Sequence, residues 1–237
     1  MFRMKNMSEI SLICFETIPS TNTSAKENIG TIKTPSLIIA NGQTAGRGRQ
    51  GKSFFSPNDT GLYMTLVFEA PQNCSLLTPA AAVSVCNILE KHGVNTKIKW
   101  VNDVFADNKK ICGILTECFA YSNKYYIALG VGINLTTSEF PDDLKIAGSI
   151  NKDFNKNLLA LEISESVLEY VNNPNDEFVL NEYRNKLFVI GQKITYSKNN
   201  VIFSATVKDI NEQCNLIVER DDGYTDILSS GEISIKI

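Results

Sequence analysis

The sequence predicts an α+β fold in which a mixed β-sheet is flanked by helices and is followed by a small β-barrel. Three observations predict this fold: alternating apolar runs in the first part of the chain, two segments with helical apolar spacing, and closely spaced short strands near the C-terminus. A chain of 237 residues can bury a core of this size. We expect a large domain over residues 1–187 and a small one over residues 188–237.

The large domain contains short strands separated by turn residues. In residues 62–69, Leu62, Met64, Leu66 and Phe68 alternate with other side chains and so share one face of a strand. In residues 97–101, Ile98 and Trp100 face away from Lys97 and Lys99, which places Trp100 in the core. The other expected strands are residues 34–40, a short pair joined at Asp107-Asn108, and a hairpin of residues 111–121 and 124–135 that turns at Ser122-Asn123.

Two segments have the apolar spacing of helices. Thr78-Pro79 supplies a helix N-cap and a first-turn proline for residues 80–91, and Gly93 ends that helix. Residues 155–171 form an amphipathic helix, which the Asn- and Pro-containing residues 172–175 break.

The small domain is expected to consist of short strands. Turn residues at Asn199-Asn200 and Asp221-Asp222-Gly223 separate them. Acidic residues outnumber basic ones over residues 204–237, which suggests that this domain attracts a basic loop of the large domain. The predicted strands are residues 193–196, 201–208, 216–219, 225–228 and 233–237.

Bulk properties exclude several classes of protein. The formal net charge of −3 argues against a general nucleic-acid or membrane-surface binder. No apolar run has the length of a membrane span, and residues 10–15 are too short for a signal peptide. We therefore expect a cytoplasmic protein that binds neither DNA nor membrane.

The cysteine and histidine content argues against disulfide and zinc sites. The six cysteines have no C-x-x-C spacing and are expected to be buried thiols in a reducing compartment. His92 is the single histidine, which argues against a zinc site, and its place before Gly93 predicts a solvated helix end.

The segment 46–53, GRGRQGKS, fits both the P-loop and the dinucleotide-binding patterns. Both patterns require a helix directly after the glycines. The following residues 54–61, FFSPNDTG, cannot sustain a helix. The segment is therefore predicted to be a flexible loop between strands, in which Arg47, Arg49 and Lys52 wrap around an anion.

Several blocks of the sequence resemble biotin protein ligases. Residues 46–51 resemble the family's GRGRxG loop, and Phe55-Ser56-Pro57 continues that resemblance. The other blocks, in the family's order and at about its spacing, are Ser20-Thr21-Asn22 for STN, residues 99–103 for KWPND, residues 109–117 for RKLxGILxE, and residues 130–134 for GxGIN. The resemblance extends over roughly residues 15–150 and more weakly to the C-terminus.

The resemblance implies a fold, an activity and partners. The fold would be a catalytic domain like that of class II aminoacyl-tRNA synthetases with an SH3-like C-terminal domain. The activity would join biotin to ATP as biotinyl-5′-AMP, with release of pyrophosphate, and then transfer biotin to a lysine of a biotin carboxyl carrier protein. ATP and Mg²⁺ would be required, with no bound prosthetic group. The chain would be the monofunctional type without an N-terminal DNA-binding domain, either as a monomer or as a homodimer.

The resemblance also assigns roles to individual residues. Lys110, Arg47 and Asp103 would be catalytic. Biotin would contact Ser20, Thr21, Asn22, Gln43, Gly46, Arg47, Lys110, Gly113, Gly130 and Gly132. The nucleotide would contact Arg47, Arg49, Lys52, Phe54, Asn102, Asp103 and Asn134. Mg²⁺ would be held mainly through the ATP phosphates, and residues 141–150 resemble a loop that covers the adenylate.

Alternatives exist for some of these residues. Lys110 could be an ordinary solvated lysine, although the opposite strand face makes Lys109 the better candidate for that. Ser20 and Thr21 could cap a helix, but Ser24 and Glu27 form a better capping box and leave them free for a ligand. Asn102-Asp103 could be a simple turn, and Asp103 could act on the metal or on the acceptor amine.

The sequence departs from the family at three positions. Val101 replaces the usual proline, Lys52 stands where arginine is common, and Phe54 stands where tryptophan is frequent. Val101 removes a rigid turn constraint, and Lys52 loses bidentate phosphate geometry. Phe54 offers less ring area and no indole N–H.

Three rival functions share some of these features. A lipoate or octanoate ligase or transferase shares the catalytic fold, but the GRGRxG and KWxND blocks argue against it. A P-loop regulator would need a helix after Lys52-Ser53. A biotin-sensing DNA-binding repressor would need an N-terminal module and a less acidic charge balance.

Overall fold

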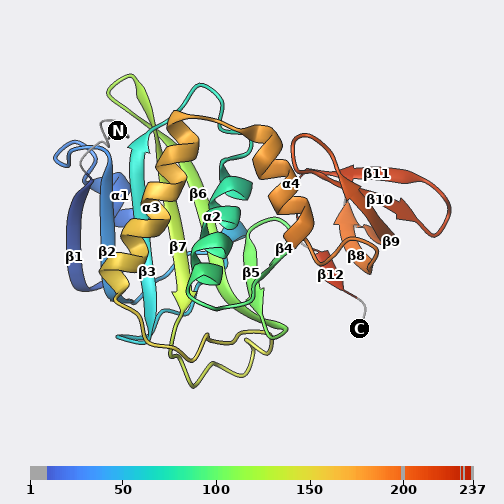
Figure 1. The fold of residues 1–237 in the computed structure, drawn as a ribbon, viewed down its shortest axis with the longest axis horizontal. Helices are drawn as coiled ribbons and strands as arrows, with labels where there is room; N and C mark the ends of the chain where they lie inside the picture. Colours follow the sequence, from blue (N-terminus) through green and yellow to red (C-terminus); the bar gives the residue numbers. More distant parts are fainter. Residues whose placement is uncertain (1–9, 199–200, 230, 232, 236–237) are drawn as a thin grey trace, which may run out of the picture.

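The larger of two sheets forms the centre of the molecule (Figure 1). The computed structural model describes residues 10–198, 201–229, 231 and 233–235. Strand order in this sheet is β1-β2-β3-β7-β6-β5-β4, with β1 parallel to β2 and the other pairs antiparallel. The sheet is therefore mixed, as predicted. Its strands are β1 (Ser11–Ile18), β2 (Ser36–Gln43), β3 (Gly61–Glu69), β4 (Lys97–Lys99), β5 (Asp103–Ala106), β6 (Lys109–Tyr121) and β7 (Lys124–Asn134).

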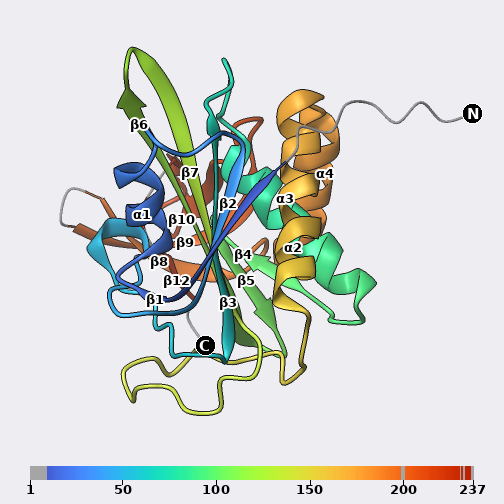
Figure 2. The same cartoon turned by 90° about the vertical axis from the view of Figure 1, so that its left-hand side faces the viewer.

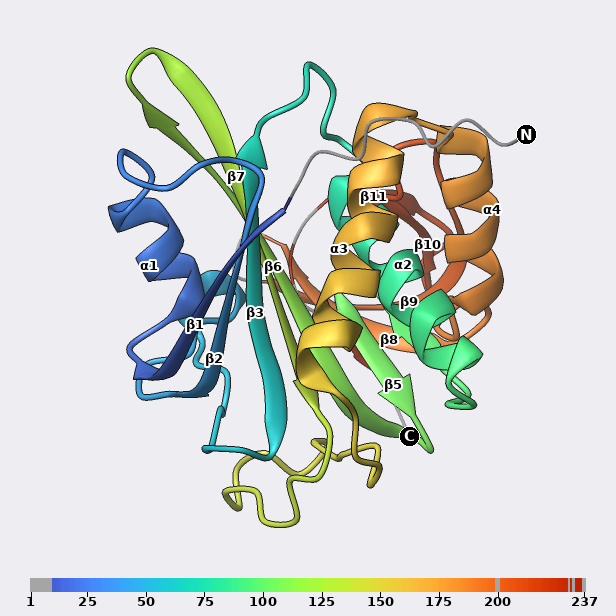
Figure 3. The ribbon, with the colours of Figure 1, turned by 60° about the vertical axis from the view of Figure 1, so that its left-hand side comes forward.

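Helices cover both faces of this sheet. Helix α1 (Thr21–Glu27) lies on one face, and α2 (Leu77–Lys91), α3 (Lys156–Asn172) and α4 (Asp176–Lys186) lie on the other (Figures 2 and 3). Strand β3 contributes side chains to the cores on both faces, because successive side chains of a strand point to opposite sides of the sheet. Leu62, Met64, Leu66 and Phe68 share one face, as predicted, and join the large core with α2 and α3, whereas Val67 packs with Ala25 of α1.

Turn chemistry fixes the β5–β6 and β6–β7 connections. Asp107 and Asn108 have φ angles of 47° and 60°, and Ser122 and Asn123 have φ angles of 46° and 63°. Two successive residues with positive φ form the tight turn that a two-residue hairpin requires. Both predicted hairpin turns are confirmed.

The structure differs from expectation at the start of α2. The helix begins at Leu77 after an N-cap at Leu76 that makes no side-chain capping bond. Thr78 is thus inside the first turn and not the N-cap, and its hydroxyl donates instead to the hydroxyl of Thr116, 2.8 Å away. The predicted cap is wrong, because the Thr78 hydroxyl bonds to Thr116 of β6 and not to the backbone of the helix.

Strand β1 and helix α4 were not predicted. Strand β1 alternates poorly between buried and exposed residues because it is an edge strand. Helix α4 buries only Val179 and Tyr183, so its apolar periodicity covers a single turn of helix. Its Asn175 cap, which accepts from the backbone N–H of Phe178, is a signal that a search for caps could have found.

The smaller sheet is antiparallel throughout, with the order β11-β10-β9-β8-β12. Gly223 turns β10 into β11 with a φ of 84°. The predicted Asn199-Asn200 turn, and residues 236 and 237 of the last predicted strand, lie outside the described residues. The strands are β8 (Lys193–Lys198), β9 (Val201–Ile210), β10 (Leu216–Arg220), β11 (Thr225–Leu228) and β12 (Ile233–Ile235).

Acidic side chains of the smaller sheet form ion pairs with basic residues of the same sheet or of α4. Buried Asp226 accepts from Lys198 and Arg220, and hydrogen bonds from Lys198 and Tyr196 hold the pKa of its carboxyl well below the ordinary value. Asp209 pairs with Arg184 of α4 at 2.8 Å, and Glu219 pairs with Lys208 at 3.0 Å. The expectation that this acidic excess attracts the basic loop is wrong for these residues, because they pair with α4 or with other residues of the small sheet and not with the loop 46–53.

The cores of the two sheets are continuous. Buried residues of the small sheet, such as Val207 and Leu216, belong to one apolar cluster with those of α2, α3 and the large sheet. Trp100 lies at the junction, with 5% of its surface exposed, and its indole Nε1 donates to the carbonyl of Cys214 at 2.8 Å. The prediction that Trp100 is a core residue is confirmed.

Three of the six cysteines are buried and three are exposed. Cys86, Cys112 and Cys214 are buried, but Cys14, Cys74 and Cys118 are exposed, so the expectation of buried thiols is wrong for these three. The C-cap of α2 is His92, whose Nε2 lies 2.9 Å from Glu162. Across residues 10–235, leaving aside the undescribed positions, no helix is long and apolar enough to cross a membrane.

Because the two sheets share one core, we predict a single cooperative unfolding transition. Trp100 is the single tryptophan and reports from the junction, whereas far-ultraviolet circular dichroism reports from all helices and strands. Thermal melts followed by tryptophan fluorescence and by circular dichroism should therefore have the same midpoint. Two separated midpoints would show that the small sheet unfolds independently.

Candidate active site

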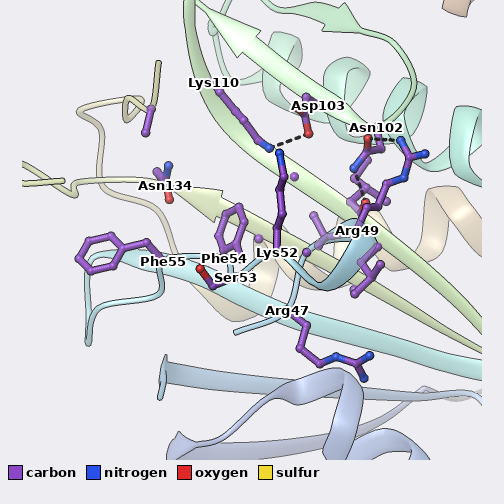
Figure 4. A pocket seen from close by; sticks show the side chains of 18 of the residues that line it. Arg47, Arg49, Lys52, Ser53, Phe54, Phe55, Asn102, Asp103, Lys110 and Asn134 are labelled. Carbon is purple, nitrogen blue, oxygen red and sulfur yellow. Dashed lines mark hydrogen bonds and ion pairs between the residues drawn. The ribbon is translucent and has the colours of Figure 1, made fainter. Parts of the chain in front are cut away.

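A cleft of about 390 Å³ opens on the α1 side of the large sheet. Its floor is formed by β3, β6 and β7, and the loop of residues 46–53 lies across it (Figure 4). The walls come from the start of α1, the turn between β4 and β5, and the loop 140–147, and Gly231 and Ile233 of the C-terminal part also line it. A cleft of this volume accommodates a small-molecule ligand.

The strand register places glycines side by side on the floor. Asp103 of β5 pairs with Gly113 of β6, which pairs with Gly132 of β7, which pairs with Tyr63 of β3. A Cβ on Gly132 would lie 2.4 Å from the ring of Phe54, and one on Gly113 would lie 3.1 Å from it. These glycines therefore make room for Phe54, which comes from the loop above.

One end of the cleft is lined by neutral side chains rich in hydrogen-bonding groups, with the Arg47–Glu117 ion pair beside them. Gln43 accepts from the backbone N–H of Thr21 at 2.8 Å and donates to Ser56 at 2.9 Å. Asn22 donates to Glu117 at 3.0 Å, and its Oδ1 accepts from Thr65 at 2.6 Å. These bonds fix the orientation of each amide, so this end presents preorganised polar groups.

Gly130 lies beneath this neutral end. A Cβ at Gly130 would lie 2.2 Å from Oδ1 of Asn22. The missing side chain therefore makes room for the Asn22 amide, as the glycines farther along the floor do for Phe54.

Ser20 also caps α1, contrary to expectation. The helix begins at Thr21, and the Ser20 side chain accepts from the backbone N–H of Thr23. The predicted capping box at Ser24 is wrong, since Ser24 lies inside the helix. The hydroxyl of Thr21 is bonded to Gln43 at 3.2 Å, so neither side chain lacks a protein partner.

The opposite end is charged. Lys110 Nζ lies 2.7 Å from Asp103 Oδ1, and Figure 4 shows the amino groups of Lys52 and Lys110 pointing to the same space. Lys109 is on the other face of β6, where its amino group donates to the carbonyl of Lys145. The predicted separation of Lys110 from Lys109 is confirmed.

Arg49 fixes the loop 46–53 to the β4–β5 turn. Its guanidinium donates to Asn102 Oδ1 at 3.0 Å, while Asn102 Nδ2 donates to the Ile114 carbonyl at 2.8 Å. Within the loop, Gly48 N–H donates to the Lys52 carbonyl at 2.7 Å. A short 3₁₀ turn (Arg49–Gly51) is present, and Lys52 through Thr60 contain no helix, as predicted.

Arg47 points away from Lys110 and Asp103 (Figure 4). Its guanidinium forms an ion pair with Glu117 at 3.1 Å, and Lys26 of α1 pairs with the same carboxylate at 2.9 Å. The structure therefore brings Lys110 and Asp103 together but places Arg47 in a separate cluster.

The Glu117 carboxylate is the anchor of that cluster. Burial alone would raise the pKa of Glu117, but hydrogen bonds from Asn22 and Lys26 and the charges of Lys26 and Arg47 outweigh this effect, so the pKa falls below its ordinary 4.5. The carboxylate therefore stays ionised at neutral pH. Its attraction for Arg47 is lost only as the pH falls through this lowered pKa.

Asn134 lies where β7 ends, beside the loop 140–147. Its Nδ2 donates to the carbonyl of Gly148 at 3.0 Å, and its buried Oδ1 has no partner among the described residues. Lys110 N–H and C=O bond to Ile146 and Gly148, which holds residues 141–150 against the charged end. Part of the loop predicted to cover the site thus lines the cleft.

The charges of the lining residues decide which ligands the cleft suits. Arg47, Arg49, Lys52, Lys99 and Lys110 are basic, whereas Asp103 and Asp143 are acidic. The described residues contain no group of three or more side chains that could hold a metal ion. This site therefore suits an anion, with a neutral polar moiety at the other end.

The fold matches that of known ligases. The chain superimposes on a biotin protein ligase from Aquifex aeolicus, solved with biotin and ATP, with a TM-score of 0.79 at 24% identity, over 95% of this chain and 98% of that one. Such a match defines the class of fold: a ligase-type mixed sheet with a small C-terminal β structure.

The sequence comparisons identify the family. Residues 14–134 match the biotin/lipoate A/B protein ligase family, and residues 189–236 match the biotin protein ligase C-terminal domain. The first of these matches covers more than half of the chain. The protein belongs to the biotin/lipoate A/B protein ligase family.

Curated relatives agree with this placement. A bifunctional ligase/repressor BirA of Bacillus subtilis is 39% identical over 124 residues, which are 49% of this chain and 38% of that protein. A biotin–[acetyl-CoA-carboxylase] ligase of Mycobacterium tuberculosis is 28% identical over 216 residues, 83% of this chain and 77% of that protein. The matched region therefore covers less than half the length of the Bacillus protein, 38% of it.

The sequence reasoning assigned no role to several residues of the site. Thr65 and Ser56 hold Asn22 and Gln43, and Glu117 holds Arg47. Thr65 is a polar residue within the apolar run of β3, and this break in the pattern is a signal that could have found it. Glu117 ends one of the blocks that resemble the ligases, but no local pattern connects it with Arg47.

We predict that Glu117→Gln loosens the loop 46–53. Arg47 then loses its ionic partner, and cleavage by trypsin after Arg47 and Arg49 should become about twofold to fivefold faster, because a partly exposed ion pair contributes at most about 1 kcal/mol. The matched control is Glu69→Gln, which removes an exposed pair with Lys124 elsewhere on the sheet. Equal loop cleavage in Glu117→Gln and the parent would refute the anchoring role.

Proposed function

We propose that this protein is a biotin protein ligase. It activates biotin with ATP to biotinyl-5′-AMP and pyrophosphate, and then transfers biotin to a specific lysine of a biotin carboxyl carrier protein. The observation that carries the proposal is one cleft with a neutral hydrogen-bonding end and a cationic end, in a chain of this family.

The two ends fit the two substrates. Biotin has a neutral ureido ring that both donates and accepts hydrogen bonds, which suits Ser20, Thr21, Asn22 and Gln43. Its carboxylate and the ATP phosphates are anions, which suit Lys110, Lys52 and Arg49. Lipoate has a dithiolane ring without hydrogen-bond donors, so it would desolvate the polar end of the cleft without donating a hydrogen bond to it.

In the first step a carboxylate oxygen of biotin attacks the α-phosphorus, and the bond to pyrophosphate breaks. Two anions must approach each other, so a fixed positive charge between them stabilises the transition state. Lys110 has this role, because Asp103 holds its amino group at the charged end of the cleft. The loop 46–53 covers the mixed anhydride and excludes water.

In the second step the acceptor amine attacks the carbonyl carbon of biotin, and AMP leaves. The amine must lose a proton, and Asp103 is the carboxylate that lies beside Lys110. We propose Asp103 as the acceptor of this proton.

Mg²⁺ would enter with the ATP phosphates. Asn134 Oδ1 is a buried acceptor without a partner among the described residues, so it suits a cation or an amino group and not a bare phosphate oxygen. Asn134 is therefore the residue that would hold Mg²⁺ there, where it would neutralise phosphate charge.

The remaining assignments are also proposals. We divide the chain into a catalytic domain over residues 1–187 and an SH3-like domain over residues 188–237, supported by the family match over residues 189–236.

The partner is a carrier domain of a biotin-dependent carboxylase, and the use of ATP supports the cytoplasm as the place of action. Phe54 would border the adenine, from its place against Gly113 and Gly132.

The direct test is to incubate the protein with Mg-ATP and either biotin or lipoate. Mass spectrometry should detect biotinyl-5′-AMP and no lipoyl-AMP, because only the ureido ring of biotin can both donate and accept hydrogen bonds at the polar end. Lipoyl-AMP alone would favour the rival function, and neither adduct would refute adenylation.

Lys110→Ala should lower the rate of adenylation by roughly 100-fold to 1,000-fold, the range for removal of a preorganised charge. Biotin affinity should change much less. The matched control is Lys109→Ala, whose side chain bonds to the Lys145 carbonyl on the other strand face and should leave the rate nearly unchanged. Biotin-dependent exchange between ATP and pyrophosphate measures both, and similar losses in the two variants would contradict the assignment.

A further inference from the structure

The turn between β4 and β5 carries two residues of the cleft, Asn102 and Asp103. The cleft side of the turn is held by Arg49, which donates to Asn102, and by Lys110, which pairs with Asp103. Both of these partners would also meet the substrates under the proposed function. They cannot therefore be the sole supports that keep the turn in place during a reaction.

The back of the same turn is held by two buried side chains. Tyr183 of α4, with 0% of its surface exposed, donates its hydroxyl to the carbonyl of Val101 at 3.0 Å. Trp100, the preceding residue, donates its indole N–H to the carbonyl of Cys214 at 2.8 Å. Two successive residues are thus fixed from behind, one by α4 and one by the segment between β9 and β10.

The chemistry of Tyr183 suits a permanent support. Burial raises the pKa of its hydroxyl well above the ordinary 10, so the group keeps its proton and remains a donor. If the hydroxyl were removed, the Val101 carbonyl would lose its donor next to the core, which is costly for a buried polar group.

The sequence leaves the turn in particular need of support. Residues 99–103, KWVND, contain no proline, so no ring restricts the backbone as it approaches Asn102 and Asp103. Two bonds between Asn102 and Ile114 of β6 hold the front of the turn, while packing of Val101 against the core and the two buried donors restrain its back.

We propose that Tyr183 and Trp100 are positioning residues that fix Asn102 and Asp103 from behind the turn, although the Trp100 side chain also lines part of the cleft. Neither is expected to touch a substrate through its polar atom, since both donors are bonded to backbone carbonyls behind the turn. Through them, helix α4 and the C-terminal β structure set the geometry of the charged end. The catalytic consequence rests on the proposed function.

The test compares Tyr183→Phe with Tyr170→Phe. Both substitutions remove one hydroxyl from the helical layer, but Tyr170 donates to Asp176 at 2.7 Å and lies outside the cleft. We expect Tyr183→Phe to lower kcat for biotin-dependent ATP–pyrophosphate exchange by on the order of 10- to 100-fold, the cost of a small misplacement of reacting groups. The KM for biotin should stay within about twofold, because the bonds that hold Gln43 and Asn22 at the polar end come from other parts of the fold.

A second variant and a second measurement keep the proposal testable. Trp100→Phe removes the other donor and should give the same pattern, with kcat reduced and the KM for biotin retained. In folded samples of both variants, hydrogen exchange of the amides of residues 100–103 should be faster than in the parent, and Tyr170→Phe should match the parent.

The outcomes separate this inference from the proposed function. A folded Tyr183→Phe protein with the parent's kcat, unchanged exchange at residues 100–103, or an equal loss in Tyr170→Phe would overturn the positioning role. A parent protein that catalyses no biotin-dependent exchange would refute the proposed function instead. The positioning role would then be decided by hydrogen exchange alone, where faster exchange in Tyr183→Phe supports it and equal exchange overturns it.

Discussion

The strand register of the large sheet is the constraint on which the rest of the site depends. Asp103, Gly113 and Gly132 lie in one row across β5, β6 and β7. A shift of one residue in β6 or β7 would turn a glycine into the core and bring a bulky side chain onto the floor of the cleft. Because both glycines lack a Cβ, the Phe54 ring can lie directly on the sheet. The loop 46–53, which precedes Phe54, can then lie close to the floor of the cleft. The floor of the cleft is thus set by backbone pairing before any charged group is considered.

The placement of the charged side chains depends on this strand register. A loop with Arg47, Arg49 and Lys52 would repel itself, and the structure divides its two arginines between separate acceptors. Arg49 is bonded to the neutral amide of Asn102 and Arg47 to the carboxylate of Glu117. The charged end of the cleft thereby keeps Lys110 with a close carboxylate, Asp103. An anionic substrate entering there meets cations that are already oriented, so little reorganisation is needed on binding.

How much of this could be read from the sequence depended on the range of the interaction. Alternation in β3 and the paired turn residues at Asp107-Asn108 are local signals, and they predicted the hairpins and the buried face correctly. Strand β1 and helix α4 have weak local patterns and become stable through neighbours that are distant in the chain. Most of the residues that the resemblance singled out line the cleft, but the resemblance did not give the orientation of Arg47. That orientation depends on Glu117, which is distant in the chain, and no local rule connects the two.

The continuous core explains why the C-terminal β structure belongs to the site and not only to the surface. A separate small domain could be attached by a few polar contacts, but here its apolar residues join the cluster that supports α2 and α4. Removing residues 190–237 would expose Trp100 and leave its indole N–H without the Cys214 carbonyl. Loss of activity in such a truncated chain would therefore not distinguish a direct role in catalysis from loss of support. Single substitutions at the junction are the more informative change, because they keep the core closed while altering one hydrogen bond at a time.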